Sequence, residues 1–223
     1  MNDYEVVAFF RTDKTEISAH AENLCKLYRL RLRYEQMPGE PFAVSALLNQ
    51  NTVLCMLDRT TFGFRKMMRY VYAIDKPVII VHRNDSPDVY NCLKVPVGYL
   101  QENKEKVVWA NFFHHHNGGS RIELVVPKEK DEDIAIMIAN NVRFIEQILH
   151  NSKSAYEKCF LEGSFEKNLK RIFRDSSDCV VFLMRPFRVF SWHLPYNIRL
   201  FRKYAHTPTM IIPRDEELYI PCH

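Results

Sequence analysis

The chain has 223 residues, of which 47% are hydrophobic and 26% charged, and its formal net charge is +4. These proportions are typical of a globular protein with one large domain or two small ones, and they exclude a disordered or fibrous chain. The charge lacks the dense basic clustering of a dedicated nucleic-acid binder, and no apolar stretch reaches the roughly 20 residues that cross a bilayer.

The first residues, MNDYEVVAFF, carry acidic side chains where a secretory signal would carry basic ones. We therefore expect a cytoplasmic protein without membrane association. The six cysteines form no CxxC pair, and we expect buried free thiols, with Cys222 the most exposed.

Strands and amphipathic helices alternate along the first third of the chain. The run YEVVAFF at residues 4–10 suits a strand covered on both faces. The expected strands are residues 4–10, 31–36, 53–57 and 78–82. The expected helices are residues 15–30, 42–48 and 62–74, where apolar side chains recur at helical spacing.

A polar, turn-rich run, NDSPDVYN, follows, and we expect residues 84–93 to be a linker. Strands are then expected at residues 94–100, 122–127, 156–161, 179–184 and 209–212. The intervening helices are expected at residues 104–116, 132–149, 164–173 and 188–204, with residues 215–223 as an irregular tail. This alternation predicts a doubly wound, mostly parallel α/β sheet with right-handed crossovers.

The end of the chain repeats the organisation of its beginning. NTVLCMLDR near residue 51 corresponds to SDCVVFLMR near residue 177, and KPVIIVHR near residue 76 corresponds to TPTMIIPR near residue 207. Two copies of one α/β fold are therefore predicted, the first of them shortened.

Several segments in order carry a family resemblance: the VPV strand at residues 95–97, KEKVVWANFF, IELVVP, EGSFEKNLKRIFRDSSDCVVFL and HTPTMIIPR. The second half of the chain resembles the universal stress protein family, and the whole chain resembles a tandem of two such domains. The resemblance implies a reduced domain at residues 1–83 and a full domain at 94–214. It also implies that strands 78–82 and 209–212 pair inside one chain as a pseudo-dimer.

Many members of this family bind ATP with an acidic residue after the first strand and a glycine-rich loop after the fourth. Here Gly98 stands where the family often has its aspartate, and no glycine follows Gly163. Since phosphates need closely approaching backbone N–H groups, ATP binding in the family mode is not expected. We expect no bound cofactor.

Candidate ligand positions lie where strands of the expected sheet end. Arginines and hydroxyls there could hold a phosphate or a nucleotide. The alternative is that Thr60 or Thr61 caps the next helix, with Asp58 and Arg59 in solvent, and that Pro186 simply begins a helix. The candidates are Asp58, Arg59, Thr60, Thr61 and Gly63 in the first half, and Val97, Gly98, Arg185 and Arg188 in the second.

Two other patterns favour simple structural explanations. His114, His115 and His116 are consecutive, so they point about 100° apart on a helix and cannot converge on one metal ion. The basic and aromatic residues of 188–203 are typical of single-strand nucleic-acid surfaces, but also of an amphipathic helix.

The leading interpretation is a non-enzymatic stress-response or regulatory protein that binds a protein partner or a small anionic ligand, with no catalytic or metal-binding residues. The alternative is an ATP-binding protein or weak ATPase with an arginine-based phosphate site. A nucleic-acid-binding module, whose affinity would fall steeply with salt, is a third. The chain would be a monomeric pseudo-dimer or a homodimer.

Overall fold

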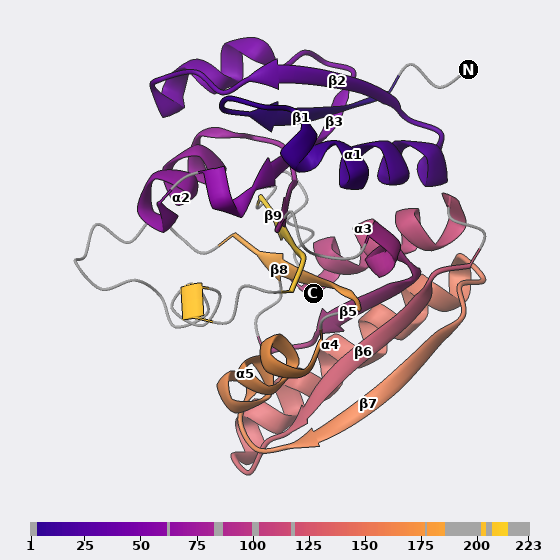
Figure 1. Ribbon diagram of the computed structural model, residues 1–223. Helices are drawn as coiled ribbons and strands as arrows, with labels where there is room; N and C mark the ends of the chain where they lie inside the picture. The colour runs from indigo at the N-terminus through magenta and orange to yellow at the C-terminus, as the bar shows by residue number, and fades with distance from the viewer. Residues whose placement is uncertain are drawn as a thin grey trace.

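The computed structural model describes residues 4–61, 63–82, 87–99, 103–116, 119–176, 178–185, 202–203 and 207–213. In this part of the chain a nine-stranded sheet carries helices on both faces (Figure 1). The predicted α/β class, with a mostly parallel sheet, is confirmed.

The strands are β1 (Glu5–Phe10), β2 (Arg31–Gln36), β3 (Thr52–Asp58), β4 (Val78–Val81), β5 (Cys92–Pro96), β6 (Arg121–Lys128), β7 (Tyr156–Glu162), β8 (Val180–Met184) and β9 (Thr209–Ile212). The α-helices are α1 (Thr15–Tyr28), α2 (Phe64–Ala73), α3 (Asn103–His116), α4 (Glu132–Asn151) and α5 (Phe165–Asp175). Three short 3-10 helices are η1 (Pro41–Leu47), η2 (Arg59–Thr61) and η3 (Pro87–Asn91).

The strand order is β2-β1-β3-β4-β9-β8-β5-β6-β7. Every neighbouring pair is parallel except β4 and β9, which run antiparallel with Ile79 opposite Met210. The pairing expected between residues 78–82 and 209–212 is therefore present. Strands β1, β3 and β4 run in one direction, and β5, β8 and β9 run in the opposite direction. The carboxyl ends of the first three strands therefore lie at one end of the strands of the sheet, and those of the other three lie at the opposite end.

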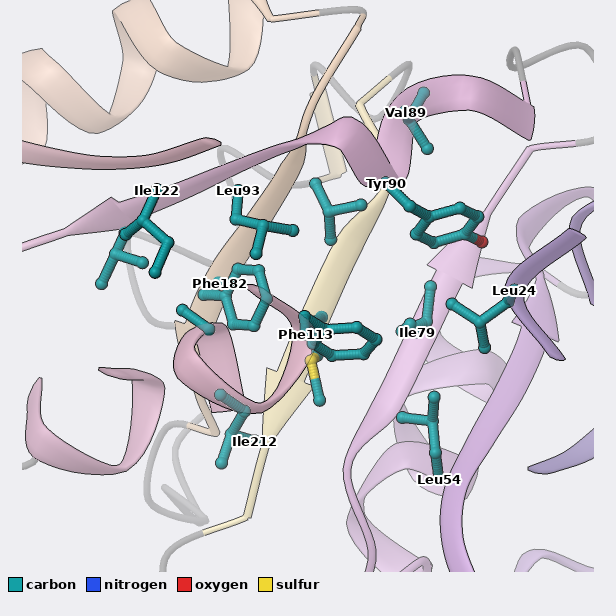
Figure 2. Packing of buried hydrophobic residues seen from close by; sticks show 14 of the residues in the cluster. Leu24, Leu54, Ile79, Val89, Tyr90, Leu93, Phe113, Ile122, Phe182 and Ile212 are labelled. Carbon is teal, nitrogen blue, oxygen red and sulfur yellow. The ribbon is translucent and has the colours of Figure 1, made fainter. Parts of the chain in front are cut away.

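One hydrophobic cluster covers the sheet face under α1, α3 and α4, and it contains residues from both ends of the chain. Figure 2 shows Leu24 and Ile79 beside Tyr90, Phe113 and Phe182. A second cluster lies on the other face under α2 and α5. The two parts of the chain are therefore joined by a continuous core as well as by a continuous sheet.

Two residues of the segment expected to be a polar linker are packed into this core. Val89 and Tyr90 of η3 are 1% and 0% exposed, and the Tyr90 ring meets that of His20 edge-on. Strand β5 begins at Cys92, two residues earlier than expected, and ends at Pro96. The polar composition of residues 84–91 concealed the two apolar anchors, which are too few to produce a periodic pattern.

Helix boundaries follow the expected capping chemistry. The amide of Gly119 donates to the His114 carbonyl at 3.1 Å with a φ of 114°, which stops α3 in the left-handed region that glycine tolerates. Ser164 accepts from the Lys167 amide at 3.5 Å, so it caps α5 as expected. The helix expected at residues 42–48 is the 3-10 helix η1, Pro41–Leu47, which buries Pro41 and Val44.

Candidate functional site

The candidate ligand residues form two separate groups. The first corner comprises Asp58, Arg59, Thr60, Thr61 and Gly63, at the carboxyl end of β3. The second corner comprises Val97, Gly98 and Arg185, at the carboxyl ends of β5 and β8. Since β4 and β9 are antiparallel, the strands of the two halves run in opposite directions, and the two corners lie at opposite ends of the strands. Arg188 lies outside the described residues.

Asp58 organises the first corner. Its carboxylate is 2% exposed and accepts from the Thr60 amide at 2.8 Å and from the Thr60 hydroxyl at 2.7 Å. The expectation that Asp58 would face solvent is therefore wrong, because its carboxylate turns inward to close the η2 turn. The Thr60 amide and hydroxyl, two donors that could have bound an anionic ligand, are hydrogen-bonded to the carboxylate of Asp58.

Arg59 reaches beyond the first corner to the other end of the chain. Its Nη2 donates to the backbone carbonyl of Arg202 at 2.8 Å. Arg202 lies in the crossover between β8 and β9, so the contact joins residues 143 positions apart. The guanidinium therefore bridges the two halves of the molecule.

Gly63 is the N-cap residue of α2 and has a φ of −57°. A Cβ built there would meet no atom within 4 Å. The space beside Gly63 is therefore open, and helix α2 begins at Gly63 without a side-chain cap rather than at Thr60 or Thr61.

The second corner is closely packed around the backbone that follows β5. The Val97 amide donates to the Val125 carbonyl at 2.9 Å, and Asn141 Nδ2 of α4 donates to the Gly98 carbonyl at 2.8 Å. A Cβ added at Gly98 would come within 3.3 Å of the Phe165 ring. A side chain at this position would push the Phe165 ring back by a few tenths of an ångström, so glycine gives the ring room.

Arg185 mirrors Arg59. Its Nη1 donates to the carbonyls of Ile74 at 2.7 Å and Val71 at 3.2 Å, at the carboxyl end of α2. A cation at that end is favoured by the helix dipole and satisfies carbonyls that the helix leaves without intrahelical partners. Each corner thus contributes an arginine that hydrogen-bonds to the crossover segment of the opposite half: Arg59 to the segment between β8 and β9, and Arg185 to the end of α2.

Three residues near the second corner were not singled out from the sequence: Lys106, Asn141 and Phe165. The Lys106 amine is buried and donates to the Pro96 carbonyl at the end of β5. Asn141 is a polar residue between buried positions of α4, which is the one sequence signal that could have marked it. Lys106 and Phe165 lie in stretches whose patterns resemble those of ordinary amphipathic helices.

The three histidines have different partners, as consecutive helical positions require. His114 Nδ1 lies 2.6 Å from the Ser120 carbonyl, His115 Nε2 2.9 Å from the Ser154 hydroxyl, and His116 Nδ1 2.8 Å from the Phe112 carbonyl. Within the described residues, no group of three or more histidine, cysteine or acidic side chains is arranged to hold a metal. The helices of that same part include none that is long and apolar enough to span a bilayer.

The basic and aromatic run at 188–203 lies outside the described residues apart from Arg202 and Lys203, which are helical. Its two interpretations, a nucleic-acid surface and an amphipathic helix, both stay predictions.

The sequence matches no protein-family model, and comparison with curated proteins finds no match. Solved structures do match the fold. A universal stress protein from Archaeoglobus fulgidus DSM 4304 has a TM-score of 0.67 at 10% identity, over 96% of this chain and 100% of that one. A putative universal stress protein from Pseudomonas aeruginosa UCBPP-PA14 has a TM-score of 0.56 at 9% identity, over 93% of this chain and 81% of that one.

A functionally unknown protein from Pseudomonas aeruginosa PAO1 is similar over 95% of this chain and 82% of its own, with a TM-score of 0.58 at 9% identity. The resemblance to universal stress proteins stated from the sequence is therefore confirmed at the level of the fold. The chain has the universal stress protein fold.

Proposed function

We propose that this protein is a non-enzymatic, cytoplasmic binding protein of the stress-response or regulatory kind, without ATP binding in the family mode. The observation that carries the proposal is the position of Arg185, whose guanidinium caps the carboxyl end of α2. In the first corner, Thr60 is similarly engaged with Asp58. The groups best suited to hold a phosphate are thus already used to hold the fold together.

The architecture we propose is a tandem of a reduced domain at residues 1–83 and a full domain at 94–214, forming an intramolecular pseudo-dimer. The antiparallel contact of β4 with β9 supports it, since the last strand of each unit then meets the other. So do the reciprocal contacts of Arg59 and Arg185 with the opposite crossover segments. We propose that this molecule recognises a protein partner or a small anion, with or without a further homodimer.

A second candidate function is nucleotide binding at the second corner. The observation that favours it is the presence of two cationic side chains, Lys106 and Arg185, near the carboxyl ends of β5 and β8, the usual ligand edge of an open α/β sheet. In this case Val97 and Gly98 would contact the nucleotide and Arg185 its phosphates. The Arg185 guanidinium would then have to leave the carbonyls of α2.

A thermal-shift titration with ATP, ADP, AMP, cyclic nucleotides and sulfate, with and without magnesium, separates the two candidates. Ligand at about 100 times its Kd stabilises the native state by about 2.7 kcal/mol, which is readily detected. We expect no shift with any nucleotide. The matched variants are Arg185→Met and Arg171→Met, the latter on the exposed face of α5.

If ATP raises the Tm of the wild type and of Arg171→Met, and Arg185→Met abolishes that rise, the second candidate replaces the first. If nucleotides have no effect, Arg185→Met should still lower the Tm relative to Arg171→Met, because the end of α2 loses its cap. Equal Tm values for the two variants would contradict the capping role.

A further inference from the structure

Two thiols lie side by side at the beginnings of two paired strands, away from both corners. In the parallel register of β5 and β8, Leu93 is opposite Val180, and Cys92 and Cys179 directly precede this pair. Adjacent strands are about 4.8 Å apart, whereas disulfide-bonded cysteines have Cα separations of about 4.4–6.8 Å. The backbone therefore places the two residues within disulfide-forming range.

Their side chains point to the same face of the sheet. Leu93 belongs to the cluster under α1, α3 and α4, so Cys92 before it projects toward the α5 side, and the Cys179 side chain is hydrogen-bonded to that of Cys92. Both thiols are free and mostly buried, with Cys92 6% and Cys179 1% exposed. Cys179 precedes β8 at a bend, which leaves its backbone freer to adjust than the middle of a strand.

The surroundings give the two sulfurs different properties. Arg121, opposite Cys92 on β6, places its Nη2 3.6 Å from the Cys92 sulfur. A hydrogen bond from Cys179, and then the Arg121 guanidinium, lower the pKa of Cys92 against the opposing effect of burial. The interaction with Cys92 and burial raise the pKa of Cys179, whose sulfur also lies 3.5 Å from Asp178 Oδ1.

We propose that Cys92 and Cys179 form a peroxide-oxidisable thiol pair, in which Cys92 reacts first and Cys179 converts the product into a disulfide. The Cys92 thiolate attacks one oxygen of hydrogen peroxide, and the O–O bond breaks to give a sulfenic acid and hydroxide. That hydroxide takes up the proton that Cys92 released on ionising and becomes water. The interaction with the Cys92 thiolate, the first cause of the raised pKa of Cys179, is then gone. The sulfur of Cys179 attacks the sulfenic sulfur, and its proton leaves with the displaced hydroxide as a second water. Two thiols and one peroxide thus give one disulfide and two waters.

The other described cysteines lack this arrangement. Burial raises the pKa of Cys25 and of Cys55 to about 12, and it also raises the pKa of Cys159, the most exposed of the described thiols. A thiol that stays protonated is a poor nucleophile toward peroxide. If exposure alone governed oxidation, Cys159 would react with peroxide first. If Cys92 and Cys179 act as a pair, Cys92 should react with peroxide first.

The test uses the full chain with Cys222→Ser, which retains the five described thiols. The protein is treated with one equivalent of hydrogen peroxide at pH 7, alkylated, digested without reductant and mapped by mass spectrometry. We expect a peptide pair joined through Cys92 and Cys179, reversed by dithiothreitol. In Cys179→Ser, Cys92 should accumulate as a dimedone-reactive sulfenic acid, and in Cys92→Ser, Cys179 should stay alkylatable.

Two further variants separate the pair from general reactivity. Cys159→Ser should leave the joined peptide unchanged, and Arg121→Gln should slow oxidation of Cys92 several-fold at pH 7 while sparing it at about pH 9, where the thiolate forms without help. Full alkylation of Cys92 after peroxide, oxidation of Cys159 ahead of Cys92, or a wild-type Cys92 that stops at the sulfenic acid would each overturn the proposal.

Discussion

Two carboxylates with little access to solvent, Glu5 and Asp58, each accept more than one hydrogen bond. The clearest case is Glu5 at the start of β1, which accepts from Arg33 on β2 at 2.9 Å, from the Thr52 hydroxyl at 2.9 Å and from Asn49 Nδ2 at 2.9 Å. Arg33 also donates to the Leu47 carbonyl at 2.8 Å. The network fixes η1 and the loop after it to the amino ends of three strands.

The pKa of Glu5 is lowered from its ordinary value of 4.5, because the hydrogen bonds from Arg33 and then Thr52 outweigh the opposing effect of burial. A carboxyl group whose pKa is lower in the folded state stabilises the fold above its unfolded pKa, and this contribution is lost as pH falls through the folded value. Glu5→Gln should therefore lower the free energy of unfolding at pH 7 by about 1–3 kcal/mol.

Urea denaturation at pH 7 and at successive values below 4.5 checks this prediction, since the difference between wild type and Glu5→Gln should narrow as pH falls. Glu162→Gln is the matched control, because Glu162 Oε1 lies 2.8 Å from Lys128 Nζ but both side chains are exposed to solvent. An exposed pair of this kind is worth about 0–1 kcal/mol. Equal effects of the two variants would contradict a structural role for the Glu5 network.

Individual elements are set by their ends and by the face they bury. Helix α4 buries Ile138, Val142, Ile145 and Leu149, and Asp131 begins it by accepting from the Ile134 amide at 3.1 Å. Helix α5 begins in the same way at Ser164, but its contact with the Lys167 amide is longer, at 3.5 Å. The same capping chemistry is therefore realised with different geometry at the two helices.

Asp131→Ala should lower the free energy of unfolding by about 1 kcal/mol, since it removes both a hydrogen bond and a negative charge at the helix start. Ser164→Ala should have a clearly smaller effect, because its bond is at the limit of hydrogen-bonding distance. Chemical denaturation of the two variants side by side provides the comparison. A larger loss for Ser164→Ala would show that bond length is not what governs these caps.

At the scale of the whole molecule, the join between β4 and β9 decides the architecture. Ile79 and Met210 face each other across it, both 0% exposed, and both belong to the cluster that contains Leu24 and Phe182. Two strands that would otherwise be exposed edges are thereby converted into the centre of the sheet. The outer edges are left to β2 and β7.

Hydrogen exchange should reflect this arrangement. Peptides covering β4 and β9 should exchange at one common rate, that of global unfolding, because opening either strand exposes the shared core. The edge strands β2 and β7 should exchange faster and serve as internal controls. If β9 exchanged well ahead of β4, the two halves would open independently and the shared core would not be cooperative.

Local periodicity, turn chemistry and the order of motifs were enough to predict the alternation of strands and helices, the caps at Ser164 and Gly119, and the resemblance to universal stress proteins. The pairing of the last strands was also predictable, but only through that resemblance. The packing of Val89 and Tyr90 was decided by tertiary structure, since two apolar residues in a polar run give no periodic signal.

The side-chain arrangement of the corners was likewise decided by tertiary structure. Arg59 and Arg185 were predicted at strand ends, yet their partners lie 143 and 111 residues away, at Arg202 and Ile74. The proximity of Cys92 and Cys179 arises only when β5 and β8 pair. A sequence specifies which side chains stand at the end of a strand, whereas the register and direction of distant strands determine what those side chains meet.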